Sequence, residues 1–212
     1  VALAVEEARL ASREQFKLST TEPVVDTVVP RLKKDATAIP LATKKELLDS
    51  YNNIMLSTPK IQSTRINYGD VGRRTTFANS EGSYIEQAKT DLTLRLTAIA
   101  REDSEIQQAG LSLGSNGEFS TVEGLQEQAR EIARRATALL SAPQVKGGEY
   151  TVILDPVLAG VFAHEAFGHL SESDHVYQNK HLRQIMVLGK RLGGKHLNII
   201  DDPTTPNPRG SH

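Results

Sequence analysis

The stretch "DLTLRLTAIA", residues 91–100, alternates apolar and polar side chains more clearly than any other part of the chain. Leu92, Leu94, Leu96 and Ala98 fall on one side of an extended strand, and threonine and arginine residues fall on the other. Such a strand needs an apolar core on one face and water on the other, which is typical of antiparallel sheets. We therefore predict an α+β protein built on an antiparallel β-meander flanked by helices.

Turn-forming residues divide the neighbouring sequence into further strands. The tetrapeptide GDVG separates two strand-like segments, 61–68 and 73–78, and NSEG and REDS mark turns on either side of the alternating stretch. Ala109, Leu111 and Leu113 indicate a fourth strand. The predicted sheet has one apolar and one polar face.

Helical periodicity occurs before and after the meander. Alanines at helical spacing predict a helix in residues 1–16, and the proline-containing residues 17–42 are interpreted as a connecting segment. Two longer helices are expected at 44–56 and 122–141, the second with apolar residues in steps of four and three. Each follows a predicted capping box, formed by Thr43 with Glu46 and by Ser120 with Glu123.

A strand–helix unit follows the second long helix. "YTVIL" at 150–154 predicts a short buried strand, and Asp155-Pro156 then opens a helix, with proline in its tolerated first position. The predicted helix spans 156–170 and contains the hexapeptide HEAFGH. The predicted meander and long helix are therefore followed by a helix that carries two histidines and a glutamate.

HEAFGH combines the residue types of a catalytic metal site. His164 and His169 offer two neutral imidazole ligands of the kind that zinc binds. Glu165 offers a carboxylate that can take a proton from an attacking water molecule. The alternative is that both histidines are ordinary helix residues, one buried and one exposed.

The spacing of the two histidines requires an irregular helix. Residues five apart differ by about 140° around a regular α-helix, so the two rings could not easily bind one ion. A π-bulge, or a helix that ends before His169, would bring the rings together, and such bulges are frequent at functional sites. Gly168 lies where either distortion costs least.

Other polar residues near the motif have two interpretations each. Glu172 and Asp174 could orient the imidazole rings, or they could belong to a solvated acidic loop. His175 and His181 are candidates for a third ligand, although an exposed surface position is the favoured interpretation of each.

Composition excludes several classes of protein. The formal net charge is -1, so a polybasic nucleic-acid binder is not indicated. The chain has no Cys, which excludes a disulfide framework within it. No apolar run reaches transmembrane length and no signal peptide opens the chain. We expect a cytoplasmic protein that binds neither membrane nor nucleic acid.

The segment "GGEYTVILDPVLAGVFAHEAFGHLSESD" resembles the signature of TldD proteins, in the TldD/PmbA family once called modulators of DNA gyrase. "NSEGSYIEQ" at 79–87 and "IIDDPTTPNPRGSH" at the end resemble other segments of that family. The resemblance covers most of residues 60–212. It departs from the usual pattern after His169, where only Glu172 and Asp174 match.

The resemblance implies a zinc metallopeptidase that acts on unfolded or short peptides. The family's zinc ligands correspond to His164 and His169, its catalytic base corresponds to Glu165, and its third ligand is a Cys that this chain does not contain. Partners implied are a peptide substrate and either a PmbA/TldE-like subunit or a second copy of the chain. Asn79, Ser80, Glu81 and Gly82 could bind peptide at a strand edge, or could form a simple β-turn.

Val1 falls within a helical pattern and the chain ends in a loop, so we expect part of a longer protein. Residues 1–148 would form an N-terminal α+β domain whose start is missing, and 149–212 would begin a truncated metal-binding domain. The fragment alone would then be inactive. Rival hypotheses are a non-catalytic assembly or chaperone-like subunit with a vestigial motif, and a nucleic-acid-associated regulator.

Overall fold

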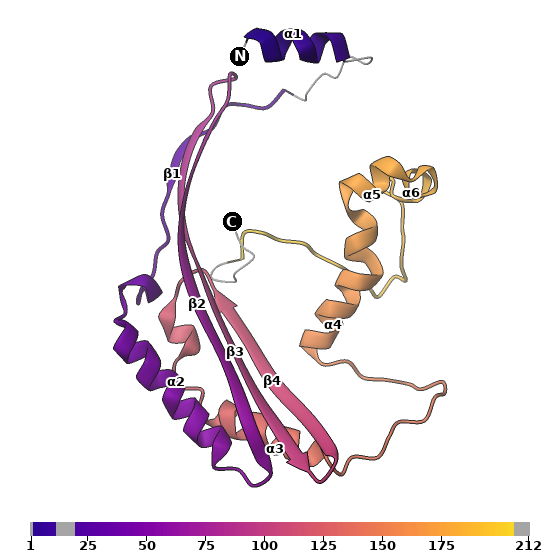
Figure 1. Cartoon of the computed structure of the whole chain (residues 1–212). Coiled ribbons are helices and arrows are strands. Elements are labelled where there is room, and N and C mark those ends of the chain that lie inside the picture. Colours follow the sequence, from indigo (N-terminus) through magenta and orange to yellow (C-terminus); the bar gives the residue numbers. More distant parts are fainter. Residues whose placement is uncertain (1, 12–19, 206–212) are drawn as a thin grey trace.

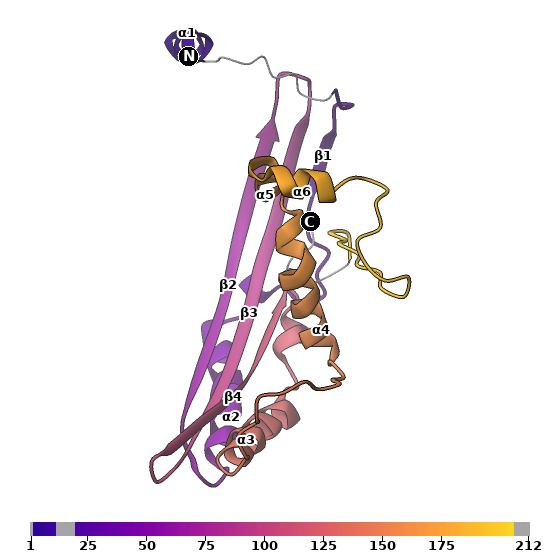
Figure 2. The ribbon, with the colours of Figure 1, turned by 90° about the vertical axis from the view of Figure 1, so that its right-hand side faces the viewer.

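The structure, a computed structural model, describes residues 2–11 and 20–205. A long twisted sheet forms its centre, and helices α2 (Leu41–Leu56) and α3 (Gln126–Leu139) cover one face. Figures 1 and 2 show that an arm carrying the C-terminal helices lies on the side of the sheet away from α2. The predicted α+β class, with a sheet flanked by helices, is confirmed.

Three of the strands form the predicted meander. β2 (Ile61–Ala78), β3 (Tyr84–Glu102) and β4 (Glu105–Ser115) pair antiparallel in sequence order. The fourth strand, β1 (Val25–Val28), pairs parallel with β3, so the sheet is mixed and not purely antiparallel. Residues 17–42 therefore do more than connect, because the part described from residue 20 onward supplies this strand and the short helix η1 (Ala36–Ala38).

The predicted GDVG turn is wrong. Residues 69–72 continue β2, with Gly69 opposite Thr93 and Gly72 opposite Thr90 of β3. The long partner strand supplies ladder partners through this region, and that outweighs the local turn preference of Gly and Asp. The chain reverses after Ala78 and again at Asp103, whose φ is 51°.

Neither predicted capping box caps a helix. Helix α2 begins after Pro40 without a side-chain cap, three residues earlier than predicted. Before α3 the chain forms a short 3-10 helix, η2 (Phe119–Val122), and Ser120 donates its hydroxyl hydrogen bond to Glu118 instead. Burial of Phe119 and Val122 holds this segment against the core, which delays the start of α3 to Gln126.

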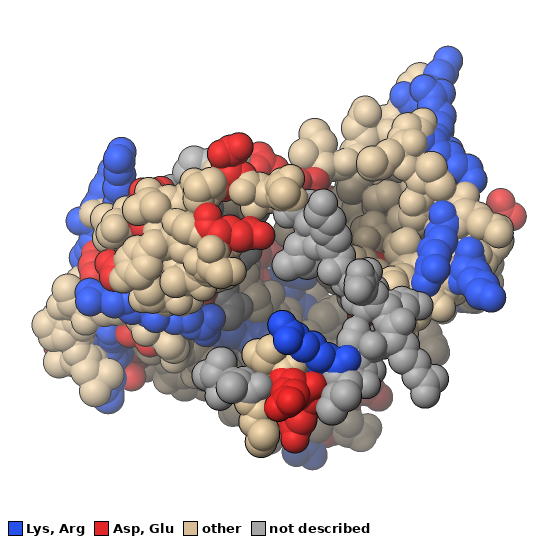
Figure 3. Space-filling view, turned by 90° about the horizontal axis from the view of Figure 1, so that it is seen from above, with Lys and Arg blue, Asp and Glu red and all other residues tan. Residues whose placement is uncertain are grey.

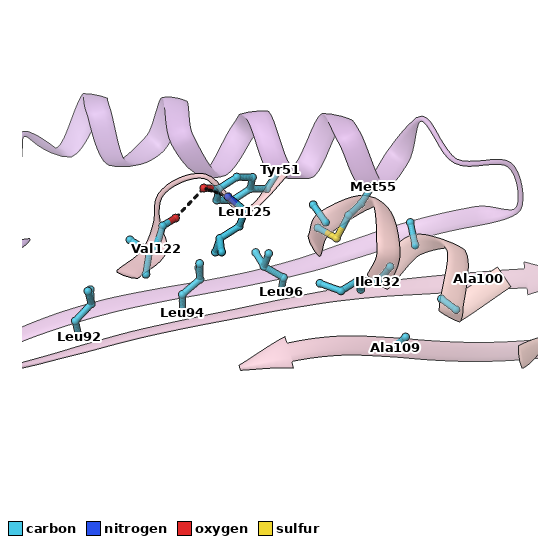
Figure 4. Close-up of a cluster of buried hydrophobic side chains, with 14 of the residues drawn as sticks. Tyr51, Met55, Leu92, Leu94, Leu96, Ala100, Ala109, Val122, Leu125 and Ile132 are labelled. Atoms are coloured by element: carbon cyan, nitrogen blue, oxygen red, sulfur yellow. Dashed lines mark hydrogen bonds between the residues drawn. The ribbon is translucent and has the colours of Figure 1, made fainter. Parts of the chain in front are cut away.

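The core lies between the inner face of the sheet and the two helices (Figure 4). The predicted apolar row of β3 is buried, and Leu94 is only 2% exposed. The Tyr51 hydroxyl donates to the carbonyl of Val122 at 2.7 Å and accepts from the amide of Leu125 at 3.3 Å. This phenol joins α2 to the segment that precedes α3.

An ion pair joins α2 to β2 at the edge of the core. Lys44 Nζ lies 2.6 Å from Asp70 Oδ2, and the two side chains are 10% and 17% exposed. Burial by itself raises the pKa of Asp70, but the hydrogen bond and charge of Lys44 outweigh it and lower that pKa. The pair therefore favours the ionised carboxylate in the folded protein.

The arm contains α4 (Pro156–Ala163), a π-helical turn (His164–Gly168), a 3-10 turn (His169–Ser171), α5 (Ser173–Gln178) and α6 (Lys180–Ile185). The predicted buried strand at 150–154 is wrong: its residues pair with no strand among those described, and Ile153 is fully exposed. An extended apolar segment forms a strand only where a neighbouring strand takes its backbone hydrogen bonds. At the N-terminus, α1 (Ala2–Ala11) occupies part of the helix predicted for 1–16, and residues 12–16 lie outside the described residues.

None of the helices in the described parts of the chain has the length and apolar character needed to cross a membrane.

Candidate metal centre

Helix α4 places the metal motif, and its start is encoded locally. Asp155 Oδ1 accepts a hydrogen bond from the amide of Leu158 at 2.7 Å, and Pro156 occupies the first helical position. Both features match the sequence prediction. His164 follows the last α-helical residue, so the helix presents the motif at its C-terminal end.

The predicted widening of the helix is present between the two histidines. The amide of His169 donates to the carbonyl of His164, five residues back, which is the hydrogen bond of a π-turn. The two imidazole rings consequently lie together, with centroids 4.3 Å apart and planes at 65°. The π-turn adds one residue to the helical turn, and this places two histidines that are five residues apart on the same side of the helix.

Gly168 does not supply this irregularity through special backbone freedom. Its φ of -53° and ψ of -57° belong to the ordinary right-handed helical region. A Cβ added to it would lie 3.5 Å from His164 Nδ1, an ordinary van der Waals distance. The bulge occurs where it was predicted, but the predicted reason, the backbone freedom of Gly168, is wrong.

Glu165 completes a cluster of possible metal donors with the histidine pair. One donor atom from each of His164, Glu165 and His169 can be chosen so that all three lie within 4.8 Å of one another. Glu165 Oε2 is 3.7 Å from His169 Nε2, and the glutamate side chain is exposed. Two imidazoles and a carboxylate at this spacing fit the ligand chemistry of zinc.

Glu172 holds one of the two rings. Its Oε1 lies 2.7 Å from His169 Nδ1, so this carboxylate fixes the ring and leaves Nε2 directed to the cluster. Asp174 makes a different contact, because its Oδ1 accepts a hydrogen bond from the amide of His175 at 2.9 Å. The sequence analysis gave Glu172 and Asp174 the same possible role, but in the structure only Glu172 contacts a ring of the histidine pair.

The candidates for a third ligand lie elsewhere. His175 groups with Glu172 and Asp174, and its Nε2 is 3.9 Å from Glu172 Oε2. His181 begins α6, where Asn179 caps the helix. Within residues 2–11 and 20–205, no other His, Asp or Glu joins the cluster of His164, Glu165 and His169.

The NSEG segment forms the turn between β2 and β3. Asn79 Oδ1 accepts hydrogen bonds from the amides of Glu81 and Ser83, at 3.2 and 2.9 Å, and Gly82 has a φ of 99° that favours glycine. These contacts account for Asn79 and Gly82 as turn residues. Figure 1 shows this turn at the upper end of the sheet, on a different element from the metal motif. A role in binding peptide stays a prediction for Asn79, Ser80, Glu81 and Gly82.

Sequence analysis missed an apolar pocket beside the motif. A volume of about 550 Å³ lies between the motif helix and the segment around residues 190–199. Phe162 and Phe167, on the helix side, are five residues apart like the histidines and so share the effect of the π-turn. That repeated spacing of large apolar residues was the available signal. The other lining residues are Leu154, Ala159, Ala163, Ala166, Lys190, Leu192, Gly193, Leu197 and Ile199.

Charged side chains are mixed on the surface seen from above (Figure 3). Lysine and arginine form several groups there, and most aspartate and glutamate lie in the left and lower parts of the view. Among the described residues on this face, basic side chains gather mainly at its edges.

Comparison with known proteins gives matches along most of the chain. The family profile described as "PmbA/TldA metallopeptidase central domain" matches residues 34–140, and the profile described as "PmbA/TldA metallopeptidase C-terminal domain" matches residues 147–212.

Individual relatives agree with these profiles. Metalloprotease slr0863 of Synechocystis is 38% identical over 211 residues, which cover 99% of this chain and 46% of that protein. Metalloprotease MJ0996 of Methanocaldococcus jannaschii is 34% identical, over 95% of this chain and 44% of its own length. A protein named zinc metalloprotease TldD homolog, from Saccharolobus solfataricus, is 32% identical over 72% of this chain and 34% of its own length. The chain spans less than half the length of these curated relatives.

Proposed function

The chain belongs to the PmbA/TldD family of metallopeptidases, and from this premise we propose that the intact protein is a zinc-dependent peptidase of unfolded or short peptides. The observation that carries the proposal is the π-turn, which brings the rings of His164 and His169 together beside the Glu165 carboxylate. A regular helix would have separated these rings. The name of the Saccharolobus relative supports the choice of zinc.

Each residue of the cluster has a separate task in the proposed reaction. His164 and His169 would hold the ion through ring nitrogens, and Glu172 keeps the His169 ring in place through Nδ1. When bound, zinc supplies Lewis acidity, which polarises the peptide carbonyl and lowers the pKa of water to about 7. Glu165 takes the proton of the attacking water and passes it to the leaving amine.

We propose that a further zinc ligand comes from outside these 212 residues. The family resemblance implies a Cys ligand, and this chain has no Cys. A catalytic zinc site typically has three protein ligands, so the 212 residues alone would lack peptidase activity.

The proposed domains are 1–148 and 149–212. The proposed partners are a peptide and either a PmbA/TldE-like subunit or a second copy, and location in the cytoplasm stays a prediction.

The test compares Glu165→Gln with wild type in the intact gene product. We expect peptide cleavage to fall by about 10²–10⁴-fold while bound zinc, measured by metal analysis, stays unchanged. Glu149→Gln is the matched control, because it removes an exposed carboxylate that precedes α4 and does not belong to the cluster. Undiminished cleavage by Glu165→Gln with its zinc retained would show that the base is another group.

Metal analysis of His164→Ala and His169→Ala tests the ligand assignment. Both variants should lose zinc, whereas His181→Ala, which changes a histidine outside the cluster, should keep it. An intact wild-type protein that carries no zinc after gentle purification would instead support the non-catalytic, chaperone-like alternative.

A further inference from the structure

The polar face of the sheet, opposite the core, carries a pair of arginines in a regular setting. Pairing places Arg65, Thr97 and Gly110 in one cross-strand row, and the adjacent row on the same face contains Asn67, Arg95 and Ser112. Arg65 and Arg95 are therefore diagonal neighbours on adjacent strands. At this position Cα atoms are about 7–8 Å apart, within the reach of two long side chains.

Both arginines are exposed and neither is neutralised. No carboxylate forms an ion pair with Arg65 or Arg95 in the parts of the chain that the structure describes. The printed contact of Arg95 is a hydrogen bond from Nε to Ser112 Oγ at 3.1 Å, which holds its guanidinium on the sheet surface. Two like charges at neighbouring positions of adjacent strands, without an ion-pair partner, attract an anion.

A depression of about 440 Å³ lies at the pair. Arg65 and Arg95 line it, together with polar residues that include Asn67, Thr97, Gln108 and Ser112. Gly110 contributes no side chain to the floor of the depression. A larger residue would not fit without a shift, because a Cβ there would lie 2.9 Å from the carbonyl oxygen of Leu96. Side-chain hydroxyls and amides beside two guanidiniums suit a carboxylate and the polar backbone of an extended chain.

We propose that this arginine pair, Arg65 with Arg95, binds acidic side chains of an extended peptide, so that the protein prefers peptides rich in Asp or Glu. This inference rests on the proposed peptidase function for its substrate class. Figures 1 and 2 place the arm that carries the metal motif on this same side of the sheet. The polar side chains that line the depression offer hydrogen bonds to the backbone of a chain that continues past its acidic side chain, which favours such a side chain over a chain terminus.

The test is a binding measurement that needs no cleavage. Fluorescence anisotropy with the intact protein would compare a short amidated peptide containing glutamates with the same peptide containing glutamines. We expect binding of the acidic peptide to be about tenfold tighter, and this preference to be lost in the double variant Arg65→Gln/Arg95→Gln. High salt should weaken the preference, because these charges are exposed.

Two controls make the result specific. Arg135→Gln removes one positive charge, half of the change in the double variant, from an exposed position on α3, which packs on the opposite face of the sheet, and should keep the preference. The variant Arg65→Lys/Arg95→Lys keeps both charges and should retain part of the preference. Equal binding of both peptides by wild type, or a preference that survives in the Arg65→Gln/Arg95→Gln protein, would overturn the proposal.

Other outcomes separate this inference from the proposed function. A preference that appears only for peptides with a free C-terminal carboxylate would overturn the assignment to acidic side chains. If Glu165→Gln leaves cleavage intact, the catalytic assignment fails while the binding result stands on its own. If the acidic preference is absent but Glu165→Gln abolishes cleavage, only the inference about Arg65 and Arg95 fails.

Discussion

The two-helix core and the arm with the metal motif contain similar apolar residues but keep their shapes by different forces. In the core, Leu94 is 2% exposed and packs between β3 and the helices. In the arm, Val157 of α4 is 78% exposed, and local hydrogen bonds such as the Asp155 cap define the helix. The apolar core and the proposed metal chemistry therefore belong to different parts of the chain, and substitutions should separate their effects.

The largest expected effect concerns packing. Leu94→Ala should lower the free energy of unfolding by about 2–5 kcal/mol, because it removes buried methyl groups and leaves a cavity. Val157→Ala in the arm should change it by less than about 0.5 kcal/mol, as for most surface substitutions. Urea unfolding of the intact protein measures both. Equal losses for the two variants would show that α4 is as tightly packed as β3.

The ion pair at the edge of the core gives a pH-dependent prediction. The pKa of Asp70 is lowered in the folded state, so its stabilisation exists above the unfolded pKa of about 3.9 and disappears as the pH falls through the folded value. Asp70→Asn should cost about 1.5–3 kcal/mol at neutral pH, because Lys44 loses its charged partner. Melting curves should also show a smaller acid-induced decrease in Tm for the variant. An unchanged acid dependence would contradict the role of this pair.

Within the arm, Glu172→Gln should weaken zinc binding by about 10–100-fold, since it alters the partner of His169 Nδ1. The free energy of unfolding of the sheet should stay near wild type. Asp174→Asn is the matched control, because Asp174 contacts the amide of His175 and not a ring of the pair. Competition with a zinc chelator measures the affinities, and similar losses in both variants would argue for a general effect of charge.

The smallest effect is expected from Gly168→Ala. The backbone at Gly168 is helical and the added Cβ would make only ordinary contacts with His164, so zinc content and cleavage should remain at wild-type levels. Helix propensity could even add about 0.5–1 kcal/mol of local stability. Loss of zinc in this variant would restore the hypothesis that the bulge forms where Gly168 makes the distortion least costly.

The sequence predicted those elements whose pattern and environment agree. The alternation in residues 91–100 identified β3 and its buried face, and Asp155-Pro156 identified the start of α4. The spacing of His164 and His169 also predicted an irregular helix, because two rings five residues apart meet only on a widened turn. These features depend on neighbours in sequence and could be read locally.

The remaining features depend on partners distant in sequence. GDVG has the composition of a turn, yet β3 holds it as part of a continuous β2. The parallel pairing of β1, four residues long, has no strong local pattern and was missed. The segment at 150–154 has the composition of a buried strand but lies exposed, because no strand beside it among the described residues accepts its hydrogen bonds.

The sequence by itself determined the periodicity of the elements and the donor types of the site, since both follow from side-chain chemistry at fixed spacing. Only the three-dimensional structure decided which of two similar carboxylates contacts the His169 ring, and which two arginines become diagonal neighbours in the sheet. Glu172 reaches His169 and Asp174 does not, and Arg65 adjoins Arg95 only through strand register. The reason is that hydrogen-bond geometry and strand pairing are set by the three-dimensional path of the backbone.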